Sequence, residues 1–274
     1  MPVLNADDLR FFEENGYGIV PNAVPQANLD ALIKVIWEFL EMDPDDPATW
    51  YAGKPRGGGL VHIHQHQALW DNRQHPRVHE AFADLFGTEK LWVSMDRASM
   101  KTPYHPDHPE FDDKGFIHWD LDTSKLPTPF GVQGVLYLTD TDADMGGFQC
   151  IPGFHRNLEE WIKTQPPDRN PRVPNLAGLI VKPIPGKAGD LLIWNRLLAH
   201  GNGRNTGVRP RLAQYITMSL ASNNEEARRE RIEAWQERRP PKWWTGDDHR
   251  REQLHGTTAQ LTPLGRKLLG LDEW

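Results

Sequence analysis

A succession of six short strand-like runs after residue 90 constrains the fold of this chain more than any other feature. The runs are separated by glycine, proline and aspartate turns, and several alternate with the two-residue period of a half-buried strand. Their sequences are LWVSMDRASM, GVQGVLYLTD, GFQCIPG, GLIVKPI, GDLLIWN and RLAQYITMSL. Such a succession predicts a mainly β protein with an antiparallel barrel or double-sheet core.

Helical patterns flank these runs on both sides. We predict a helix that opens at Asp7 and closes at Gly16, followed by a short strand at 18–21. An apolar stripe predicts a second helix over 28–41, and HPRVHEAFADLFG predicts a third that ends at a glycine. Residues 43–60 are rich in proline, aspartate and glycine, which favours a loop. A last helix is expected over 224–238, before a pair of prolines.

We find no internal repeat and no linker long enough to divide the chain. The sequence therefore predicts a single domain spanning 1–274. It has a helical N-terminal flank at 1–90, a β core at 91–222 and a helical tail at 223–274.

Composition excludes several classes of function. The formal net charge of -7 argues against a nucleic-acid partner, because such proteins usually carry a basic face. Cys150 is the single cysteine, so the chain forms no internal disulfide and no cysteine-based zinc site. The first residues do not resemble a secretory signal, and no apolar stretch is long enough to span a membrane. We expect a cytoplasmic protein with no membrane partner.

The sharpest local pattern is FIHWDLDTS. His118 and Asp120 lie two residues apart, so on a strand both side chains leave the same face. His200 follows 82 residues after His118 (200 − 118), just beyond the strand predicted in GDLLIWN. Two imidazoles and one carboxylate on one face of an iron leave coordination positions open, as non-haem Fe(II) oxygenases require. We predict that His118, Asp120 and His200 bind the metal. Asp122, two residues further on, is the competing carboxylate, but its spacing of four would strain a short strand.

Arg211 follows His200 by eleven residues (211 − 200), on an alternating strand. A planar guanidinium suits bidentate binding of a carboxylate, which in this class is the distal carboxylate of 2-oxoglutarate. Arg209 has the same parity, but Pro210 intervenes and Arg209 is expected in the turn. We therefore predict that Arg211, and neither Arg209 nor Arg204, binds the cosubstrate.

Three segments resemble the phytanoyl-CoA dioxygenase-like family of Fe(II)/2-oxoglutarate-dependent oxygenases. They are FFEENGYGIVPNAV, GVQGVLYLTDTDADMGGFQCIPGFHR and GDLLIWNRLLAHGNGRNTGVRPR, and together they cover most of the chain. The resemblance implies a double-stranded β-helix (jelly-roll or cupin-like) core with flanking helices. It also implies Fe(II), 2-oxoglutarate and O2 as the reactive partners of His118, Asp120, His200 and Arg211.

The resemblance suggests further contacts to the cosubstrate. Asn202 lies two residues after His200, where the family often has a small polar residue. Ser99 and Gln133 lie on core strands where relatives often have polar groups that face 2-oxoglutarate. For each of these three residues, a strand position facing solvent or a backbone carbonyl is the open alternative. The residue between the two ligands, often glutamine in relatives, is Trp119 here, so that contact does not transfer.

Other histidines are possible ligands. His62, His64 and His66 alternate and on a strand would share one face, but no carboxylate joins them, so we favour exposed or pocket-lining side chains over a second metal site. HPDHP at 105–109 is interpreted as a loop, and His155, after a proline and glycine, as structural.

The predicted function is a dioxygenase that oxidises, most simply hydroxylates, a small organic molecule with release of succinate and CO2. Two alternatives stay open. The first is a 2-oxoglutarate-independent cupin-type metal dioxygenase, which would have no need of Arg211. The second is a catalytically silent small-molecule-binding sandwich, against which the intact set of His118, Asp120, His200 and Arg211 argues. The substrate and the oligomeric state stay open.

Overall fold

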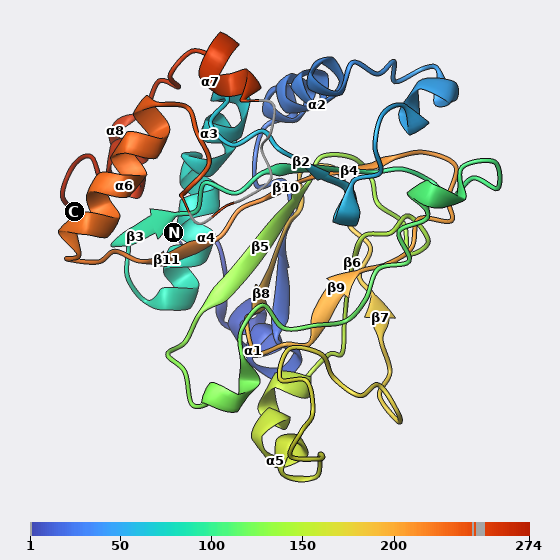
Figure 1. The fold of residues 1–274 in the computed structure, drawn as a ribbon. Coiled ribbons are helices and arrows are strands. Elements are labelled where there is room, and N and C mark those ends of the chain that lie inside the picture. Colours follow the sequence, from blue (N-terminus) through green and yellow to red (C-terminus); the bar gives the residue numbers. More distant parts are fainter. Residues whose placement is uncertain (1, 243, 245–249) are drawn as a thin grey trace.

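The computed structural model describes residues 2–242, 244 and 250–274, with a twisted antiparallel sheet at its centre (Figure 1). That sheet has six strands in the order β1-β8-β5-β10-β4-β2, beside a three-stranded sheet, β7-β6-β9, and a two-stranded one, β11-β3. The strands are Tyr17–Val20 (β1), Leu60–Val61 (β2), Leu91–Val93 (β3), Ala98–Lys101 (β4), Val132–Tyr137 (β5), Phe148–Cys150 (β6), Lys182–Pro183 (β7), Leu191–Asn195 (β8), His200–Asn202 (β9), Arg211–Tyr215 (β10) and Met218–Leu220 (β11).

Helices contribute more of the described residues than strands do, although the sheets are antiparallel as predicted. The α-helices are Ala6–Asn15 (α1), Gln26–Leu40 (α2), Gln67–Arg73 (α3), Pro76–Phe86 (α4), Leu158–Lys163 (α5), Glu225–Gln236 (α6), Arg251–His255 (α7) and Pro263–Leu269 (α8). Short 3₁₀ helices lie at Pro47–Tyr51, Gly57–Gly59, Pro109–Phe111, Thr123–Lys125 and Phe154–Arg156. None of the described helices has the length and apolar character that crossing a membrane requires.

Local sequence explains where the predicted helices begin and end. Asn5 caps α1 by accepting hydrogen bonds from the backbone N–H groups of Asp7 and Asp8, while the Asp8 side chain bonds back to Asn5. Gly16 (φ 80) and Gly87 (φ 67) end α1 and α4 in the left-handed conformation that glycine adopts without strain. The predicted helices over 28–41 and 224–238 are confirmed as α2 and α6.

Two of the predicted strands are each divided between sheets. LWVSMDRASM forms β3 and β4, and RLAQYITMSL forms β10 and β11. The breaks face each other: β3 pairs with β11 and β4 with β10, both antiparallel. Backbone hydrogen bonds span the bend, from Ser94 N to Thr217 O at 2.7 Å and from Tyr215 N to Arg97 O at 3.0 Å. The two segments of the chain therefore leave the central sheet together and stay hydrogen-bonded to each other.

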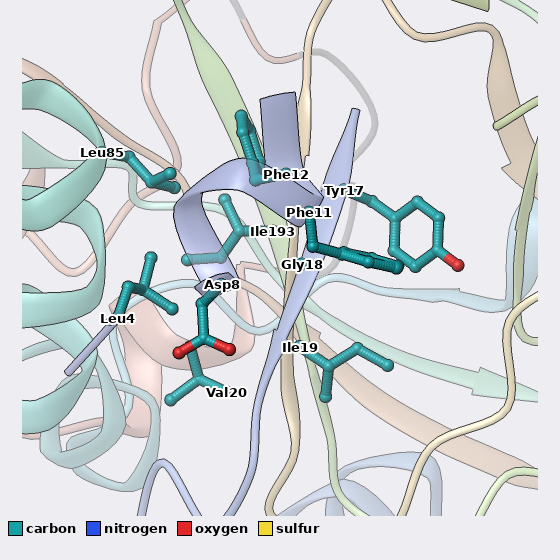
Figure 2. Close-up of a pocket in the computed structure, with 10 residues that line it drawn as sticks. All are labelled: Leu4, Asp8, Phe11, Phe12, Tyr17, Gly18, Ile19, Val20, Leu85 and Ile193. Atoms are coloured by element: carbon teal, nitrogen blue, oxygen red, sulfur yellow. The ribbon is translucent and has the colours of Figure 1, made fainter. Parts of the chain in front are cut away.

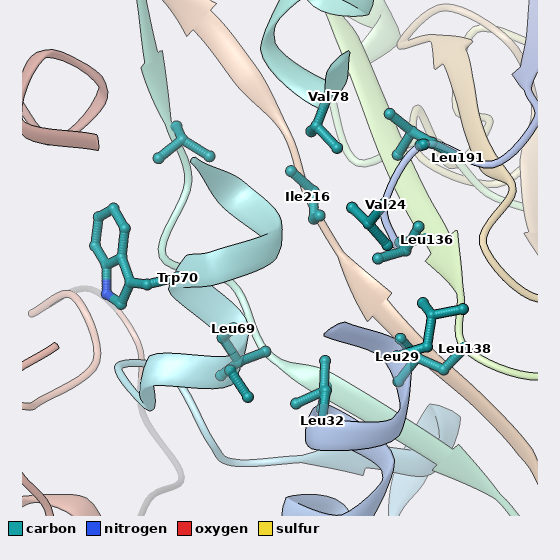
Figure 3. Close-up of a cluster of buried hydrophobic side chains, with 14 of the residues drawn as sticks. Val24, Leu29, Leu32, Leu69, Trp70, Val78, Leu136, Leu138, Leu191 and Ile216 are labelled. Carbon is teal, nitrogen blue, oxygen red and sulfur yellow. The ribbon is translucent and has the colours of Figure 1, made fainter. Parts of the chain in front are cut away.

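The central sheet separates two hydrophobic cores. On one face, Leu136, Leu191 and Ile216 pack against residues of α2, α3 and α4 that include Leu32 and Leu69 (Figure 3). On the other face, alternate residues such as Leu192, Trp194 and Ala213 pack against Phe148 and Cys150 of the three-stranded sheet. Figure 1 shows the corresponding layers, with helices on one side of β5 and β10 and with β6, β7 and β9 on the other. The second core thus lies between two sheets, and the predicted ligands come from its edge.

Candidate metal centre

A single β-bridge joins the two halves of the predicted triad. His200 opens β9, and the backbone N–H of His118 donates to the carbonyl of His200 at 2.8 Å. The N–H of His200 donates back to the carbonyl of His118 at 3.1 Å. The strand expected under His118 and Asp120 is wrong in detail, because only this bridge forms and Asp120 lies in the bend after it. The bridge nevertheless fixes the two histidines side by side.

The three side chains converge as a metal requires. One ligand atom from each of His118, Asp120 and His200 lies within 4.8 Å of the others. The Nε2 of His118 lies 3.4 Å from Oδ1 of Asp120, and the Nε2 of His200 lies 3.4 Å from Oδ2. Among the described residues no other group of histidine, cysteine and acidic side chains meets this condition. Two imidazoles and a carboxylate suit an iron(II) ion with open positions.

Neighbouring groups fix the orientation of His200. Its Nδ1 lies 2.8 Å from the carbonyl oxygen of Leu198, so Nδ1 donates its proton there and Nε2 presents a lone pair to the site. The ring is buried and stacks at 15° on Phe148, and the tilted ring of Trp194 lies beside Phe148, 4.9 Å from His200 between centroids. His200 therefore needs little reordering to bind a metal.

The carboxylate of Asp120 is held by Gln133. The Nε2 of Gln133 donates to Oδ2 of Asp120 at 2.6 Å, and Arg172 donates to the Asp120 carbonyl. Burial acts to raise the pKa of Asp120, but the adjacent rings of His118 and His200 and the hydrogen bond from Gln133 outweigh it and hold the pKa well below its usual range. The carboxylate of Asp120 is therefore ionised, as a metal ligand must be. The predicted contact of Gln133 with 2-oxoglutarate stays a prediction, whereas its contact with Asp120 was not foreseen.

Arg211 is buried on the inner face of the central sheet. Its Nη1 donates to Oγ of Ser99 and its Nη2 to the carbonyl of Gly146, both at 3.2 Å. Its Nε has no hydrogen-bond partner among the described residues. A buried guanidinium with an unused donor is suited to a carboxylate ligand. Ser99, also fully buried, thus lies beside the predicted cosubstrate arginine, and its contact with 2-oxoglutarate stays a prediction.

Lys101 is a second buried cation here that the sequence prediction missed. It pairs across the strands with Arg211, and its Nζ donates to the carbonyl of Gly203 at 2.5 Å and lies 3.5 Å from Asp113. Burial lowers the pKa of Lys101 to about 8, although Asp113 opposes this shift. The signal was available, because Lys101 lies two residues after Ser99 and so shares its face of the strand.

The neighbouring arginines lie elsewhere, as predicted. Arg209 is about half exposed, with 52% of its side chain accessible, and donates to the carbonyl of Asp140 at 3.1 Å. Arg204 forms a bidentate pair with Asp112 at 2.6 and 2.9 Å. Asn202, two residues past His200, donates to the hydroxyl of Tyr215 at 2.9 Å.

The other candidate ligands have different partners. His64 is fully buried, with Nδ1 at 3.0 Å from the carbonyl of Met95, and His66 caps α3 by accepting from Ala68 N. His62, His64 and His66 do not lie on a strand, so they do not share the face that a second metal site would need. The expectation of exposed side chains is wrong for His64, which is fully buried. Asp122 caps the helix Thr123–Lys125 instead of joining the triad.

The remaining histidine interpretations are confirmed. His155 has its Nε2 at 3.1 Å from the carbonyl of Glu13, against the end of α1, as a structural residue would. His105 and His108 lie in a loop, where the ring of His108 stacks on Tyr51 at 4.6 Å and 5°.

A surface hollow between α1 and β1 is unrelated to this centre. It holds about 270 Å³ and is lined by residues such as Phe11, Tyr17 and Ile193 (Figure 2). None of the predicted ligands borders it. This hollow is therefore not part of the predicted metal centre.

Comparisons with known proteins agree with this centre. The family model described as phytanoyl-CoA dioxygenase matches residues 12–213. A Dictyostelium discoideum protein that is provisionally named a phytanoyl-CoA dioxygenase is 24% identical, with 80% of this chain and 76% of that protein covered. Ectoine dioxygenase from Bordetella bronchiseptica is 22% identical, with 80% and 77% covered. The crystal structure of the epimerase SnoN with Fe3+, alpha ketoglutarate and nogalamycin RO has a TM-score of 0.57 at 16% identity, covering 78% of this chain and 82% of that one.

The family match contains every residue of the candidate centre. It spans most of the chain and includes His118, Asp120, His200 and Arg211. On this evidence the chain belongs to the phytanoyl-CoA dioxygenase family of Fe(II)/2-oxoglutarate-dependent oxygenases.

Proposed function

We propose that this enzyme oxidises, most simply hydroxylates, a small organic molecule, with His118, Asp120 and His200 as its iron ligands. The observation that carries the proposal is the convergence of these three side chains within 4.8 Å, with His200 and Asp120 already oriented by neighbours. Bound iron(II) would supply the redox chemistry by which O2 and 2-oxoglutarate become succinate and CO2 while a C–H bond of the substrate is oxidised.

Arg211 and Ser99 are proposed to bind the distal carboxylate of 2-oxoglutarate. The guanidinium is buried and positioned by Ser99 and Gly146, while its Nε has no partner among the described residues. Charge-assisted hydrogen bonds in a buried site contribute about 1.5–3 kcal/mol each. A cupin-type enzyme that dispenses with 2-oxoglutarate would not need this arginine, so the buried side chain supports the cosubstrate-dependent reaction. Asn202, two residues after His200, is also proposed to contact 2-oxoglutarate.

Other residues would orient the iron ligands and exclude water from the site. Gln133 holds Asp120 at the metal, and the aromatic rings of Phe148 and Trp194 fix His200 and exclude water from its buried side. Such preorganisation lets ligands act without reordering at the moment of reaction.

The architecture completes the proposal. We interpret the six-stranded and three-stranded sheets, which share the second core, as a double-stranded β-helix within a single domain over 1–274. The sole cysteine is buried and free, which suits a cytoplasmic location. One relative is named for ectoine, a small molecule, and a small-molecule substrate is proposed here too.

The test is a reaction with Fe(II), 2-oxoglutarate and O2 in which succinate formation is measured. The wild-type protein should form succinate only when all three are present. Asp120→Ala should lose this activity, because the ionised ligand is gone, whereas His255→Ala, at an exposed position in α7, should retain it. Iron-independent succinate formation, or full activity of Asp120→Ala, would refute the proposal.

A further inference from the structure

We propose that Arg97 binds a carboxylate of the primary substrate and so selects acids over their neutral analogues. This inference rests on the proposed function, since it names the substrate class of the same site. It is carried by the position of Arg97 on the sheet and by the unused donors of its buried guanidinium.

Strand register places Arg97 on the metal-facing side. Tyr215 lies opposite Arg97, because its backbone N–H donates to the Arg97 carbonyl at 3.0 Å. Next along the two strands, Ser99 pairs with Ala213 and Lys101 with Arg211. Side chains two apart on a strand share a face, so Ser99 and Lys101 lie on the inner face with Arg211. Arg97 is the residue just before β4, and we infer that it continues this alternation because Tyr215 lies opposite it. This row has a cation at each end: Lys101 and Arg211 at the cosubstrate end, and Arg97 at the other.

Arg97 lies within electrostatic reach of the metal carboxylate. Burial lowers the pKa of Arg97, while Asp96, Tyr215 and Asp120 act in the opposite direction. Tyr215 in turn accepts a hydrogen bond from Asn202, two residues after the ligand His200. The guanidinium thus lies within electrostatic reach of Asp120, toward the end of the row away from Arg211, and we infer that a substrate would lie between Arg97 and the metal.

Among the described residues the guanidinium of Arg97 donates to no carbonyl, unlike those of two other buried arginines. Only 9% of its side chain is exposed, and its Nε lies 3.2 Å from Asp96. Its Nη1 has no hydrogen-bond partner among the described residues. By contrast, Arg73 donates to the carbonyls of His64 and Asp96, and Arg231 donates to three carbonyls. A buried charged donor left unsatisfied costs about 1–3 kcal/mol or more, so the free Nη1 of Arg97 is available to a ligand.

Aromatic packing holds Arg97 in place for this role. Its guanidinium carbon lies 3.2 Å from the ring centroid of Trp244, which covers one face of the plane. The ring of His64 lies 6.0 Å from Trp244, and burial lowers the pKa of His64 to about 3, so His64 is neutral and does not compete for an anion. A planar cation with one face covered and Nη1 open recognises a carboxylate in its plane.

The experiment uses the full chain with Fe(II) and 2-oxoglutarate. The probes are hexanoate, 3-phenylpropionate and cyclohexanecarboxylate, each beside its primary amide, which has similar shape but no charge. Two readouts are followed: the change in the visible absorption band of the iron–2-oxoglutarate complex without O2, and succinate formation with O2. At least one acid should change both readouts, and its amide should not.

The variants separate charge from shape. Arg97→Gln should raise the acid concentration for half-maximal effect at least about tenfold, which corresponds to about 1.4 kcal/mol. Arg97→Lys should lie between Arg97→Gln and the wild type, because it keeps the charge but loses the planar pair of donors. Thermal unfolding checks that both variants fold, and if Arg97→Gln does not, Arg97→Lys and the acid–amide comparison in the wild type decide.

The outcomes distinguish this inference from the proposed function. A wild-type protein without the iron–2-oxoglutarate band and without succinate formation would contradict the proposed function itself. A normal band with equal responses to acid and amide, no response to any acid, or an unchanged acid response in Arg97→Gln would overturn the role of Arg97 alone.

Discussion

Gln133 lies outside the predicted metal triad, but we expect it to affect the affinity for iron(II). Its side chain donates to Asp120 at 2.6 Å, which orients the carboxylate toward both histidines. Partners of this kind usually contribute ten- to a hundredfold to metal affinity. We predict that Gln133→Leu lowers iron(II) affinity at least about tenfold, measured by titration without O2. Gln149→Leu, which loses only a contact to a backbone carbonyl, is the matched control and should bind iron normally. Equal affinity of the two variants would contradict this role.

Arg211 and Arg209 provide a matched pair for the cosubstrate. Arg211 is buried against Ser99, whereas Arg209 bonds a surface carbonyl. Loss of a charge-assisted bond of about 1.5–3 kcal/mol should weaken 2-oxoglutarate binding at least about tenfold in Arg211→Ala. Arg209→Ala should bind it like the wild type. Calorimetric titration with a redox-inert metal measures both, and the reverse pattern would show that the strand register is misassigned.

Among single residues, the sequence predicts those that form motifs and misses those that come together only in the fold. His118, Asp120, His200 and Arg211 have a recognisable order and spacing. Lys101 and Arg97 belong to no motif, since their importance comes from strands β4 and β10 lying side by side. The alternation around Ser99 was the available signal, because it gives all three residues one face.

Among the elements, long amphipathic helices were predicted and short ones were not. α1, α2, α4 and α6 carry capping residues or a clear apolar stripe, whereas α3, α5, α7 and α8 have at most seven residues. Two turns or fewer show too little periodicity to identify. The strand bends between β3 and β4 and between β10 and β11 were equally hidden, because nothing in the alternation marks a change of sheet. The bridge of His118 to His200 depends on a contact across 82 residues (200 − 118).

The end of α6 offers a test of pH dependence. Glu230 accepts from Arg239 at 2.6 and 2.9 Å and from the backbone of Lys242 at 2.9 Å. The bonds from Arg239, helped by Lys242, lower the pKa of Glu230 to about 2. In the unfolded chain this pKa is about 4.3. The stabilisation by Glu230 is therefore present above about pH 4.3 and is lost as the pH falls toward 2.

We predict that the difference in the free energy of unfolding between Glu230→Gln and the wild type becomes smaller as the pH falls. Urea unfolding at about pH 6 should show the variant less stable. At about pH 3 the difference should shrink, because Glu230 is then protonated in the unfolded chain while it is still mostly ionised in the folded protein. Comparison at each pH cancels the titration of all other groups. Parallel curves for the two proteins would contradict this assignment.

In the whole molecule, the central sheet separates the helix-side core from the predicted metal ligands. Leu32 is fully buried in the helix-side core, on the face of the sheet opposite to the metal ligands. Leu32→Ala should cost about 2–5 kcal/mol of the free energy of unfolding, as buried leucines typically do. Iron affinity of the folded variant should stay within about threefold of wild type, since distant sites act independently. Urea unfolding and iron titration test this, and a tenfold loss of affinity in folded Leu32→Ala would show that the layers are coupled.

The central claim is that His118, Asp120 and His200 hold one iron(II) per chain, and an anaerobic iron titration tests it most directly. The wild type should bind one equivalent. Alanine at any of the three positions should lower the affinity at least about tenfold. Asp122→Ala removes the nearby carboxylate that caps a 3₁₀ helix and should leave the affinity unchanged. Wild-type affinity in His200→Ala or Asp120→Ala, or a loss confined to Asp122→Ala, would contradict the account.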